Sequence, residues 1–450
     1  MPASTFSSAK LSVVLKSLPD CQGYVIAFSG GIDSHVLLHS IVGLKTELMA
    51  PVSAVHVNHG LSSNAGLWAR HNREICATLG LDLAVIEVDA RCPPGESPEA
   101  WARRKRYAAL AEHIGTGRIL LTAHHKDDQA ETLLLQLFRG AGPAGLSAMP
   151  VTQTFSLGWH CRPLLDFSRL ELQRYALQFG LQWIEDESNQ DTGFDRNHIR
   201  HQLLPVIKRH WPGVITTLSR AAHHQAEAAE LQDQLARLDL AMIAEGDSLA
   251  KLNTTALKSL TLSRQKNVLR YWLHMLQLPL PDAGQIHHII DDVINSGPGA
   301  TPCVAWPGAE VRRYRQYLYA MKPLSKHNPE QILTWDLERP LMITHGRLVA
   351  RIGQGPGLKA NCCSNKRVEI RYRSGGETIQ PAGREYHHEL KKLLQDQGVP
   401  PWLRYRIPLL YIDGSLAAVP GKWIAQEFVG AGGEPCWQLI WEDLEQIFPV

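Results

Sequence analysis

The chain lacks any apolar run long enough to cross a lipid bilayer. A membrane-spanning helix needs about twenty consecutive apolar residues, whereas stretches such as 119–121 and 133–135 hold only a few. The first ten residues are polar and contain no apolar segment of the kind found in secretory signals. These absences predict a cytoplasmic protein with no membrane partner.

Closely spaced cysteines are also missing. The chain has eight cysteines but no Cys-x-x-Cys pair, which excludes the usual zinc-ribbon and thioredoxin-type arrangements. An even cysteine count indicates a disulfide framework only in short secreted chains. We therefore expect reduced thiols.

An excess of charge of one sign is absent as well. The formal net charge of +2 is too small to indicate a nucleic-acid-binding protein by itself. The distribution of charge along the chain is more informative. Lys and Arg outnumber Asp and Glu between residues 366 and 422, and all charged residues after 422 are acidic. A basic patch of this kind can contact nucleic-acid phosphates.

Short apolar runs alternate with helical periodicity through residues 24–140. Strands are predicted at 24–28, 52–57, 83–88 and 118–123, and helices at 34–44, 67–79, 97–113 and 128–139. This βαβ rhythm predicts an α/β domain built on a parallel sheet.

At 450 residues the chain is too long for one hydrophobic core. We expect a parallel-sheet domain at residues 1–213, followed by a long helix and a helical domain at 214–325. A linker region is expected at 326–365, and a small α+β domain that carries the basic patch at 366–450.

A glycine-rich turn directly follows the first predicted strand and precedes a helix, with the sequence Ser29-Gly30-Gly31-Ile32-Asp33-Ser34. Two glycines let the backbone turn tightly and approach a ligand closely, and helix N-termini attract phosphates. An aspartate beside an anion indicates that it holds Mg²⁺ or a substrate group, because two negative charges would otherwise repel. The structural alternative is an ordinary turn capped by Ser or Asp. No Lys follows the glycines as in a Walker loop, and the G-x-G-x-x-G spacing is absent from this turn.

A second polar run, His124-His125-Lys126-Asp127-Asp128-Gln129-Ala130-Glu131-Thr132, follows the strand predicted at 118–123. On a helix, His124, Asp128 and Glu131 would share one face. Carboxylates at this edge of a parallel sheet can hold Mg²⁺ or accept a proton from an amine. The structural alternative is that Asp128 and Glu131 form a capping box.

The glycine-rich turn resembles the signature of the PP-loop ATP pyrophosphatases, which split ATP between its α- and β-phosphates. The run at 124–132 resembles the H-x-x-D-D-x-x-E-T motif of the lysidine synthetases and related thiolation enzymes in that superfamily. Its continuation, Phe138-Arg139-Gly140, matches the lysidine synthetase family more closely. The segments 55–60 and 196–200 are also similar to that family.

The resemblance implies a parallel-sheet adenylating domain in a ligase that uses ATP and Mg²⁺. Such a ligase would adenylate the wobble cytidine of the isoleucine tRNA with the CAU anticodon and then attach free L-lysine. The resemblance assigns nucleotide binding to Ala27, Ser29, Gly30, Gly31, Ile32, Asp33, Ser34 and His56. It assigns catalysis to Asp33, His124, Asp128, Glu131 and Arg196, and Mg²⁺ to Asp33 and Asp128. The oligomeric state stays open, a homodimer included.

Basic residues beside phosphate-binding, aromatic or apolar positions are the predicted RNA contacts: Arg103, Arg200, Arg313, Lys391, Lys392 and Arg404. Two other functions remain. One is tRNA thiolation in the same superfamily, for which Cys362-Cys363 is the only adjacent cysteine pair. The other is an RNA-binding protein that senses ATP without catalysis.

Overall fold

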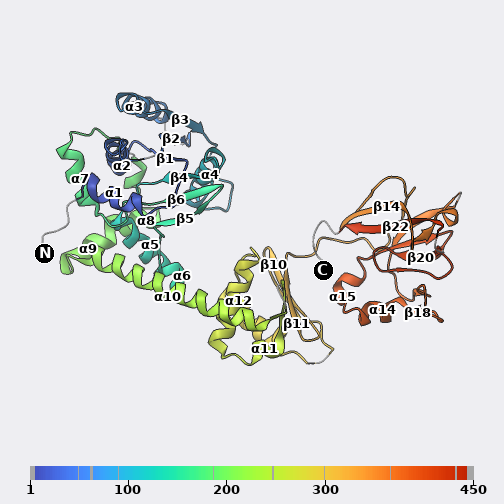
Figure 1. Cartoon of the computed structure of the whole chain (residues 1–450). Helices are drawn as coiled ribbons and strands as arrows, with labels where there is room; N and C mark the ends of the chain where they lie inside the picture. The colour runs from blue at the N-terminus through green and yellow to red at the C-terminus, as the bar shows by residue number, and fades with distance from the viewer. Residues whose placement is uncertain are drawn as a thin grey trace. The chain divides into compact units, whose positions relative to one another are not determined.

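Two compact units, Met1–Leu231 and Gln232–Val450, make up the computed structural model of the chain (Figure 1). The structure describes residues 6–48, 50–60, 64–89, 91–185, 187–245, 248–297, 299–364, 366–430 and 433–442. Within these ranges no helix combines the length and the apolar character that a membrane crossing requires.

A six-stranded sheet forms the centre of the first unit. Its strand order is β3-β2-β1-β4-β6-β5, and all neighbouring strands are parallel except β5 and β6. The strands are β1 (Gly23–Ala27), β2 (Val52–Asn58), β3 (Leu83–Glu87), β4 (Arg118–Leu121), β5 (Thr152–Phe155) and β6 (Gly158–Cys161). The predicted α/β class is confirmed.

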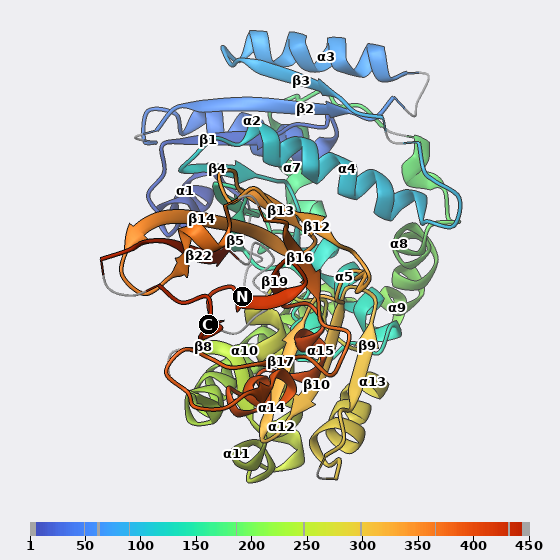
Figure 2. The same cartoon turned by 90° about the vertical axis from the view of Figure 1, so that its right-hand side faces the viewer.

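Helices cover both faces of this sheet (Figure 2). Ile26 and Phe28 pack on one face against α1 (Ser8–Lys16), α2 (Ile32–Gly43) and α7 (Arg169–Gln178). Val25 packs on the other face with α4 (Pro98–His113). Strands buried on both faces carry apolar residues at nearly every position, which explains the continuous apolar runs. The remaining large helix of the sheet, α3 (Ala65–Thr78), follows β2.

The strand order reverses at β1, which pairs with β2 on one side and with β4 on the other. In open α/β sheets, ligands bind at the carboxyl ends of the strands, at the point where the strand order reverses. The helices that begin at this edge are α2, after β1, and α5 (Lys126–Phe138), after β4. Both polar motifs of the sequence lie here.

A small second core fixes α5 against the segment that follows in the chain. Ala130 and Leu134 of α5 pack with Ile199 and Leu204. The packing elements are α8 (Asp195–His198), the π-helix η2 (Ile199–Leu203), α9 (Leu204–His210) and the start of α10 (Val214–Ile243). This packing brings the 196–200 segment alongside α5. The short helix α6 (Pro143–Leu146) and the 3-10 helix η1 (Glu187–Gln190) complete the unit.

The second unit contains a five-stranded sheet with the order β7-β8-β11-β10-β9. Its core includes the fully buried Trp272 of α12 (Leu262–Met275). The other elements are β7 (Ala244–Glu245), β8 (Ser248–Asn253), α11 (Thr254–Lys258), α13 (Ala283–His288), η3 (Ile289–Ile294), β9 (Cys303–Trp306), β10 (Ala309–Tyr314) and β11 (Tyr317–Met321). The region predicted as helical thus also holds a sheet.

The rest of this unit is mainly antiparallel strands with two short helices. One sheet has the order β12-β16-β19-β20-β21 and another the order β13-β14-β22-β15. The elements are β12 (Leu333–Thr334), β13 (Leu341–Ile343), β14 (Gly346–Gln354), β15 (Leu358–Lys359), η4 (Ala360–Cys362), β16 (Val368–Tyr372), β17 (Thr378–Ile379), β18 (His388–Glu389), α14 (Leu390–Asp396), α15 (Pro401–Arg404), β19 (Pro408–Ile412), β20 (Ser415–Val419), β21 (Trp423–Ile424) and β22 (Pro435–Glu442).

The linker predicted at 326–365 is not observed. Four strands, β12 to β15, lie within it, and β14 pairs with β22 from Arg347 to Gln354. Because β22 is distant from β14 in the sequence, no local sequence pattern predicts that the two strands pair.

Candidate active site at the carboxyl edge of the sheet

The glycine-rich turn between β1 and α2 presents an uncapped helix N-terminus. Gly31 is the N-cap residue of α2, and no side chain caps this helix. Ser34 Oγ instead donates a hydrogen bond to the Gly31 carbonyl at 2.9 Å and lies 3.1 Å from Ser29 Oγ. The side-chain cap proposed as the structural alternative is therefore not observed. First-turn N–H groups without a side-chain acceptor suit a phosphate.

Gly30 has no room for a side chain. Its φ is +90°, and a Cβ built on it would lie 2.5 Å from Oδ1 of Asn72 and 2.9 Å from Cδ1 of Ile184. The Gly30 carbonyl also accepts a hydrogen bond from the Ile184 N–H at 2.9 Å. The glycine is thus required by the packing of the turn itself.

His125 begins the second motif as the N-cap residue of α5. Its backbone is extended, and it forms a capping box with Asp128, whose Oδ2 accepts the His125 N–H at 2.9 Å. The alternative of a capping box formed by Asp128 and Glu131 is therefore wrong, because Asp128 is the N3 partner of His125 and Glu131 lies outside the box. His124 lies before the helix, so the prediction that His124, Asp128 and Glu131 share one helical face is wrong for His124.

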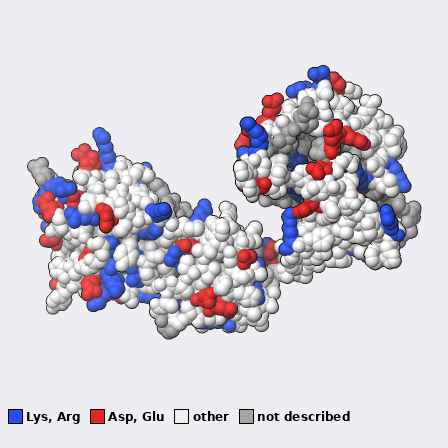
Figure 3. Space-filling view, turned by 180° about the vertical axis from the view of Figure 1, so that it is seen from behind, with Lys and Arg blue, Asp and Glu red and all other residues white. Residues whose placement is uncertain are grey.

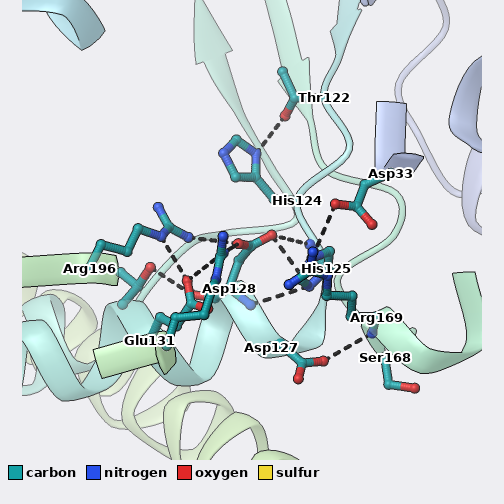
Figure 4. A network of polar contacts seen from close by, with 12 residues as sticks. Asp33, Thr122, His124, His125, Asp127, Asp128, Glu131, Ser168, Arg169 and Arg196 are labelled. Atoms are coloured by element: carbon teal, nitrogen blue, oxygen red, sulfur yellow. Dashed lines mark hydrogen bonds and ion pairs between the residues drawn. The ribbon is translucent and has the colours of Figure 1, made fainter. Parts of the chain in front are cut away.

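The imidazole of His125 joins the two motifs. Its Nε2 lies 3.5 Å from Oδ2 of Asp33 and its Nδ1 lies 3.4 Å from Oδ2 of Asp128. Burial lowers the pKa of His125, but the carboxylates of Asp128 and Asp33 outweigh this effect and raise it to about 9. The imidazole of His125 therefore lies between the carboxylates of Asp33 and Asp128 (Figure 4).

Arg196 and Arg200 cover the acids of α5, and Figure 4 shows Arg196 beside Asp128 and Glu131. Glu131 is 1% exposed and accepts from Nε of Arg196 at 2.8 Å and from Nε of Arg200 at 2.6 Å. Asp128 Oδ1 accepts from Nη2 of Arg196 at 2.9 Å and from Nη2 of Arg200 at 3.0 Å. Burial raises the pKa of Asp128, yet His125, Arg196 and the neighbouring cations hold it well below its usual range. Buried carboxylates need such partners.

Asp33 carries a carboxylate oxygen that accepts no hydrogen bond from the described residues, and this oxygen is called the open acceptor below. Its Oδ1 is buried and has no hydrogen-bond partner among the described residues, whereas both oxygens of Asp128 already accept hydrogen bonds. No group of three or more potential metal-ligating side chains is present within the described ranges. Mg²⁺ in phosphate-binding sites commonly takes one or two carboxylates and completes its shell with phosphates and water. Asp33 fits that use.

Three other predicted residues of this unit also have defined positions. Ala27 ends β1 immediately before the turn. His56 is buried, with Nδ1 2.9 Å from the Phe28 carbonyl oxygen and 3.0 Å from Nδ2 of Asn72. It therefore contacts the residue that precedes the glycine-rich turn. Arg103 lies on α4 with its guanidinium 4.9 Å from the centre of the Tyr107 ring.

The basic residues predicted to contact RNA in the second unit differ in accessibility. Lys391 and Lys392 are exposed on α14. Arg313 donates to the carbonyls of Ile294 and Ser296 at 2.9 and 2.8 Å. Arg404 is 7% exposed and donates to the Val399 carbonyl at 2.8 Å. On the visible face of both units, acidic and basic side chains are interspersed (Figure 3).

Of the two adjacent cysteines, Cys363 is poorly suited to sulfur transfer. Burial raises the pKa of the Cys363 thiol to about 11, whereas sulfur chemistry requires the thiolate.

Sequence reasoning did not single out several polar residues around these motifs. They are His125, Asn72, Thr122, His160 and Arg162, which hydrogen-bond to or pack against the predicted residues. The only signal in the sequence was the position of His125 inside the second motif. The others lie on separate elements, and only the folded sheet brings them together.

Family models match three segments of the chain. Residues 4–207 match the family model of the PP-loop domain, which binds ATP. Residues 252–319 match the TilS substrate binding domain, and residues 368–441 match the TilS substrate C-terminal domain.

Full-length relatives are similar as well. The tRNA(Ile)-lysidine synthase of Methylococcus capsulatus is 43% identical over 410 residues, which cover 91% of this chain and 93% of the relative. That of Coxiella burnetii is 41% identical over 436 residues, with 96% of each chain covered. That of Pectobacterium atrosepticum is 36% identical over 435 residues, with 96% and 97% covered. Identity of this level over nearly the full length shows that the chain belongs to the tRNA(Ile)-lysidine synthase family.

Proposed function

We propose that the chain ligates free L-lysine to the wobble cytidine of the isoleucine tRNA with the CAU anticodon, in the cytoplasm. ATP adenylates the cytosine and releases pyrophosphate, and the lysine amine then displaces AMP to form lysidine. The observation that carries this assignment is the uncapped N-terminus of α2 beside Asp33, whose Oδ1 is an open acceptor across from the His125–Asp128 pair.

The turn at 29–34 would hold the phosphates that leave as pyrophosphate. Its first-turn N–H groups have no side-chain cap, and helix N-termini favour negative charge. Asp33 would hold Mg²⁺ through its open oxygen, and the bound ion would neutralise charge on the phosphates. The predicted Mg²⁺ role of Asp128 is less well supported, because its oxygens already accept from His125, Arg196 and Arg200.

Arg196 and Arg200 would stabilise charge on the departing pyrophosphate. Five hydrogen bonds to Asp128 and Glu131 hold their guanidiniums in place. Groups whose orientation is fixed before the reaction stabilise a transition state without a reorganisation cost. The same bonds favour an active-site role for Arg200 over the predicted RNA contact.

Lysine attacks as a free amine, although its unperturbed pKa is about 10.4. A base must therefore remove a proton. Asp128, Glu131 and His124 are the candidates from the sequence. Glu131 is almost fully enclosed by its two arginines, so it serves as a base only if that cluster opens.

The RNA would be held partly by the second unit. Lys391 and Lys392 are exposed on α14, and their cationic side chains are suited to phosphates. Arg103 on α4 of the first unit is also proposed to contact the RNA. The internal hydrogen bonds of Arg313 and Arg404 favour structural roles for these two residues.

The test combines purified protein, ATP, Mg²⁺, labelled lysine and a tRNA transcript with the CAU anticodon. We expect lysine incorporation with one AMP released for each lysine attached. Asp33→Asn should abolish it, whereas Asp127→Asn should not, because Asp127 is held by Lys208 at 3.3 Å and by the Arg169 N–H at 3.0 Å. ADP as the product, or sulfur from cysteine in the tRNA, would contradict the assignment.

A further inference from the structure

A chain of buried hydrogen bonds leads from the core of the first unit to His124. Nη2 of Arg162 lies 3.2 Å from Nδ1 of His160, and Nε2 of His160 lies 2.8 Å from Oγ1 of Thr122. The same Oγ1 lies 2.9 Å from Nδ1 of His124. Figure 4 shows the outer end of this chain, with His124 between Thr122 and the Asp128–Arg196 pair.

The direction of the first bond follows from the chemistry of arginine. A guanidinium has only donors, so Nδ1 of His160 must accept from Arg162. A second Arg162 donor, Nη1, is bonded to the Pro150 carbonyl at 2.8 Å, which fixes the guanidinium in place. A neutral His160 with Nδ1 as acceptor carries its proton on Nε2 and donates it to Thr122.

The second half of the chain follows from the single proton of the Thr122 hydroxyl. Oγ1 accepts from His160, and the hydroxyl is buried, so its own proton needs an acceptor. Among the described residues the structure offers it Nδ1 of His124. If His124 carried its proton on Nδ1, the Thr122 oxygen would face two donors and its own proton would be left unpaired in the interior.

The charge states agree with this arrangement. Burial and the neighbouring Arg162 lower the pKa of His160 to about 3. Burial holds the pKa of His124 well below its usual value, although Asp128 acts in the opposite direction. Both rings are therefore neutral near pH 7, so each has one donor and one acceptor nitrogen.

We propose that Arg162, His160 and Thr122 hold His124 as the neutral tautomer with its proton on Nε2, so that His124 donates a hydrogen bond to a substrate oxygen and does not act as the base. This inference rests on the proposed function for the identity of the substrate. The acceptor is an oxygen on which negative charge develops, as on the phosphoryl group or the cytosine carbonyl.

The assignment changes how protons move during ligation. The C–N bond to lysine forms, the C–O bond that joins the base to AMP breaks, and AMP leaves with the electron pair. The proton that the nitrogen loses must pass to a group other than His124, because Nε2 is already protonated and Nδ1 is occupied by Thr122. His124 is thus a catalytic hydrogen-bond donor, and Thr122, His160 and Arg162 are positioning residues.

The tautomer can be observed directly by ¹⁵N NMR of the full-length protein labelled at histidine imidazoles, with His124→Gln used to assign the His124 signals. We expect a protonated Nε2 and an unprotonated Nδ1 near pH 7, and loss of this state in Thr122→Val. This spectrum needs no substrate, so it tests the inference separately from the proposed function. A proton on Nδ1, a cationic ring, or an unchanged spectrum in Thr122→Val would overturn the inference.

Activity provides a second measurement. We expect Thr122→Val to lower kcat for lysine incorporation by about tenfold to a hundredfold, less than the ~10²–10³ lost when a transition-state donor is removed outright. KM for ATP and lysine should change less than twofold, and Thr122→Ser should restore most of the rate. His124→Gln can present a donor near the Nε2 position and should exceed His124→Asn in rate. Equal loss in both His124 variants would favour a base and contradict the inference.

Discussion

Nε2 of His125 lies 3.5 Å from Oδ2 of Asp33. This contact joins the turn after β1 to the first residue before α5, two segments that meet only because β1 and β4 are neighbours in the sheet. With Asp128 on its other side, His125 sets the distance between the two acidic residues that the resemblance assigned to Mg²⁺. The position of the open Asp33 oxygen therefore depends on a residue outside the turn.

Two substitutions of His125 separate its role as the N-cap of α5 from its contact with Asp33. His125→Asn should keep the helix cap, because asparagine is a favourable N-cap residue, but its side chain is too short to reach Asp33. We expect nearly unchanged thermal stability and a pyrophosphate release rate at least tenfold lower. His125→Ala should lose the cap as well, at about 1 kcal/mol. Calorimetry and a pyrophosphate assay measure the two effects, and a fully active His125→Asn variant would contradict this coupling.

Adjacent glycines in the turn should respond differently to alanine. Gly30→Ala adds a Cβ at φ +90°, 2.5 Å from Asn72, and we expect a loss of about 1–3 kcal/mol in the free energy of unfolding. Gly31 has φ −74°, and its nearest contact for a Cβ is Ser29 Oγ at 3.6 Å. Gly31→Ala should therefore remain stable. Denaturant unfolding of both variants makes the comparison, and equal destabilisation would contradict it.

The sequence carried enough information for the parallel-sheet unit because its signals are local. Alternating apolar runs predicted β1 to β4 and α2 to α5 within a few residues, and the glycine-rich turn lies where it was expected. The edge strand β5 and its neighbour β6 were missed. Of the four strands in the expected linker, β14 pairs with β22, which is far away in the sequence.

The contacts of the site were harder to predict than its motifs. Helical periodicity placed His124 on α5, but the helix begins two residues later because His125 takes the cap. The closing of Arg196 and Arg200 over Asp128 and Glu131 depends on the packing of η2 against α5. Burial is likewise a property of the tertiary fold. Arg404 was predicted to contact RNA, but it is buried and its guanidinium donates to the Val399 carbonyl.

The pair of Glu131 and Arg200 should show strong energetic coupling. Arg200→Met leaves one fewer cation on a carboxylate that is 1% exposed, and breaking a buried pair costs about 3–5 kcal/mol. Glu131→Gln alone should also destabilise the protein. The double variant should lose less than the sum of the two, by about 0.5–3 kcal/mol. Denaturant unfolding of all four proteins measures the cycle, and simple additivity would show that Arg196 alone satisfies Glu131.

Lys391 and Lys392 should contribute to tRNA affinity through phosphates. Replacing both by alanine should weaken binding and reduce the dependence of log K on log salt by about one unit for each lost phosphate contact. The exposed Lys16 and Lys45 of the first unit provide a control with the same change in charge. Filter binding at several salt concentrations distinguishes the pairs. An equal change in both would indicate an effect of net charge alone.

His160 should make the protein sensitive to acid. Its pKa is about 3 in the folded state and 6.5 without the fold, so below pH 6.5 the unfolded chain binds a proton that the native chain excludes. The stability present above pH 6.5 is therefore lost as the pH falls toward 3, by up to about 1.4 kcal/mol per pH unit from this group.

His160→Gln removes this titration and keeps groups that can hydrogen-bond to Thr122 and Arg162. Between pH 7.5 and pH 5 the variant should lose less stability than the parent, by up to about 2 kcal/mol. Buried histidines outside the chain that links His160, Thr122 and His124 titrate equally in both proteins and cancel in the difference. The exposed His113 serves as a control, since His113→Gln removes an imidazole that is already in water. Parallel pH profiles for parent and His160→Gln would mean that the fold does not lower the pKa of His160, and this would contradict an unprotonated Nδ1 that accepts from Arg162.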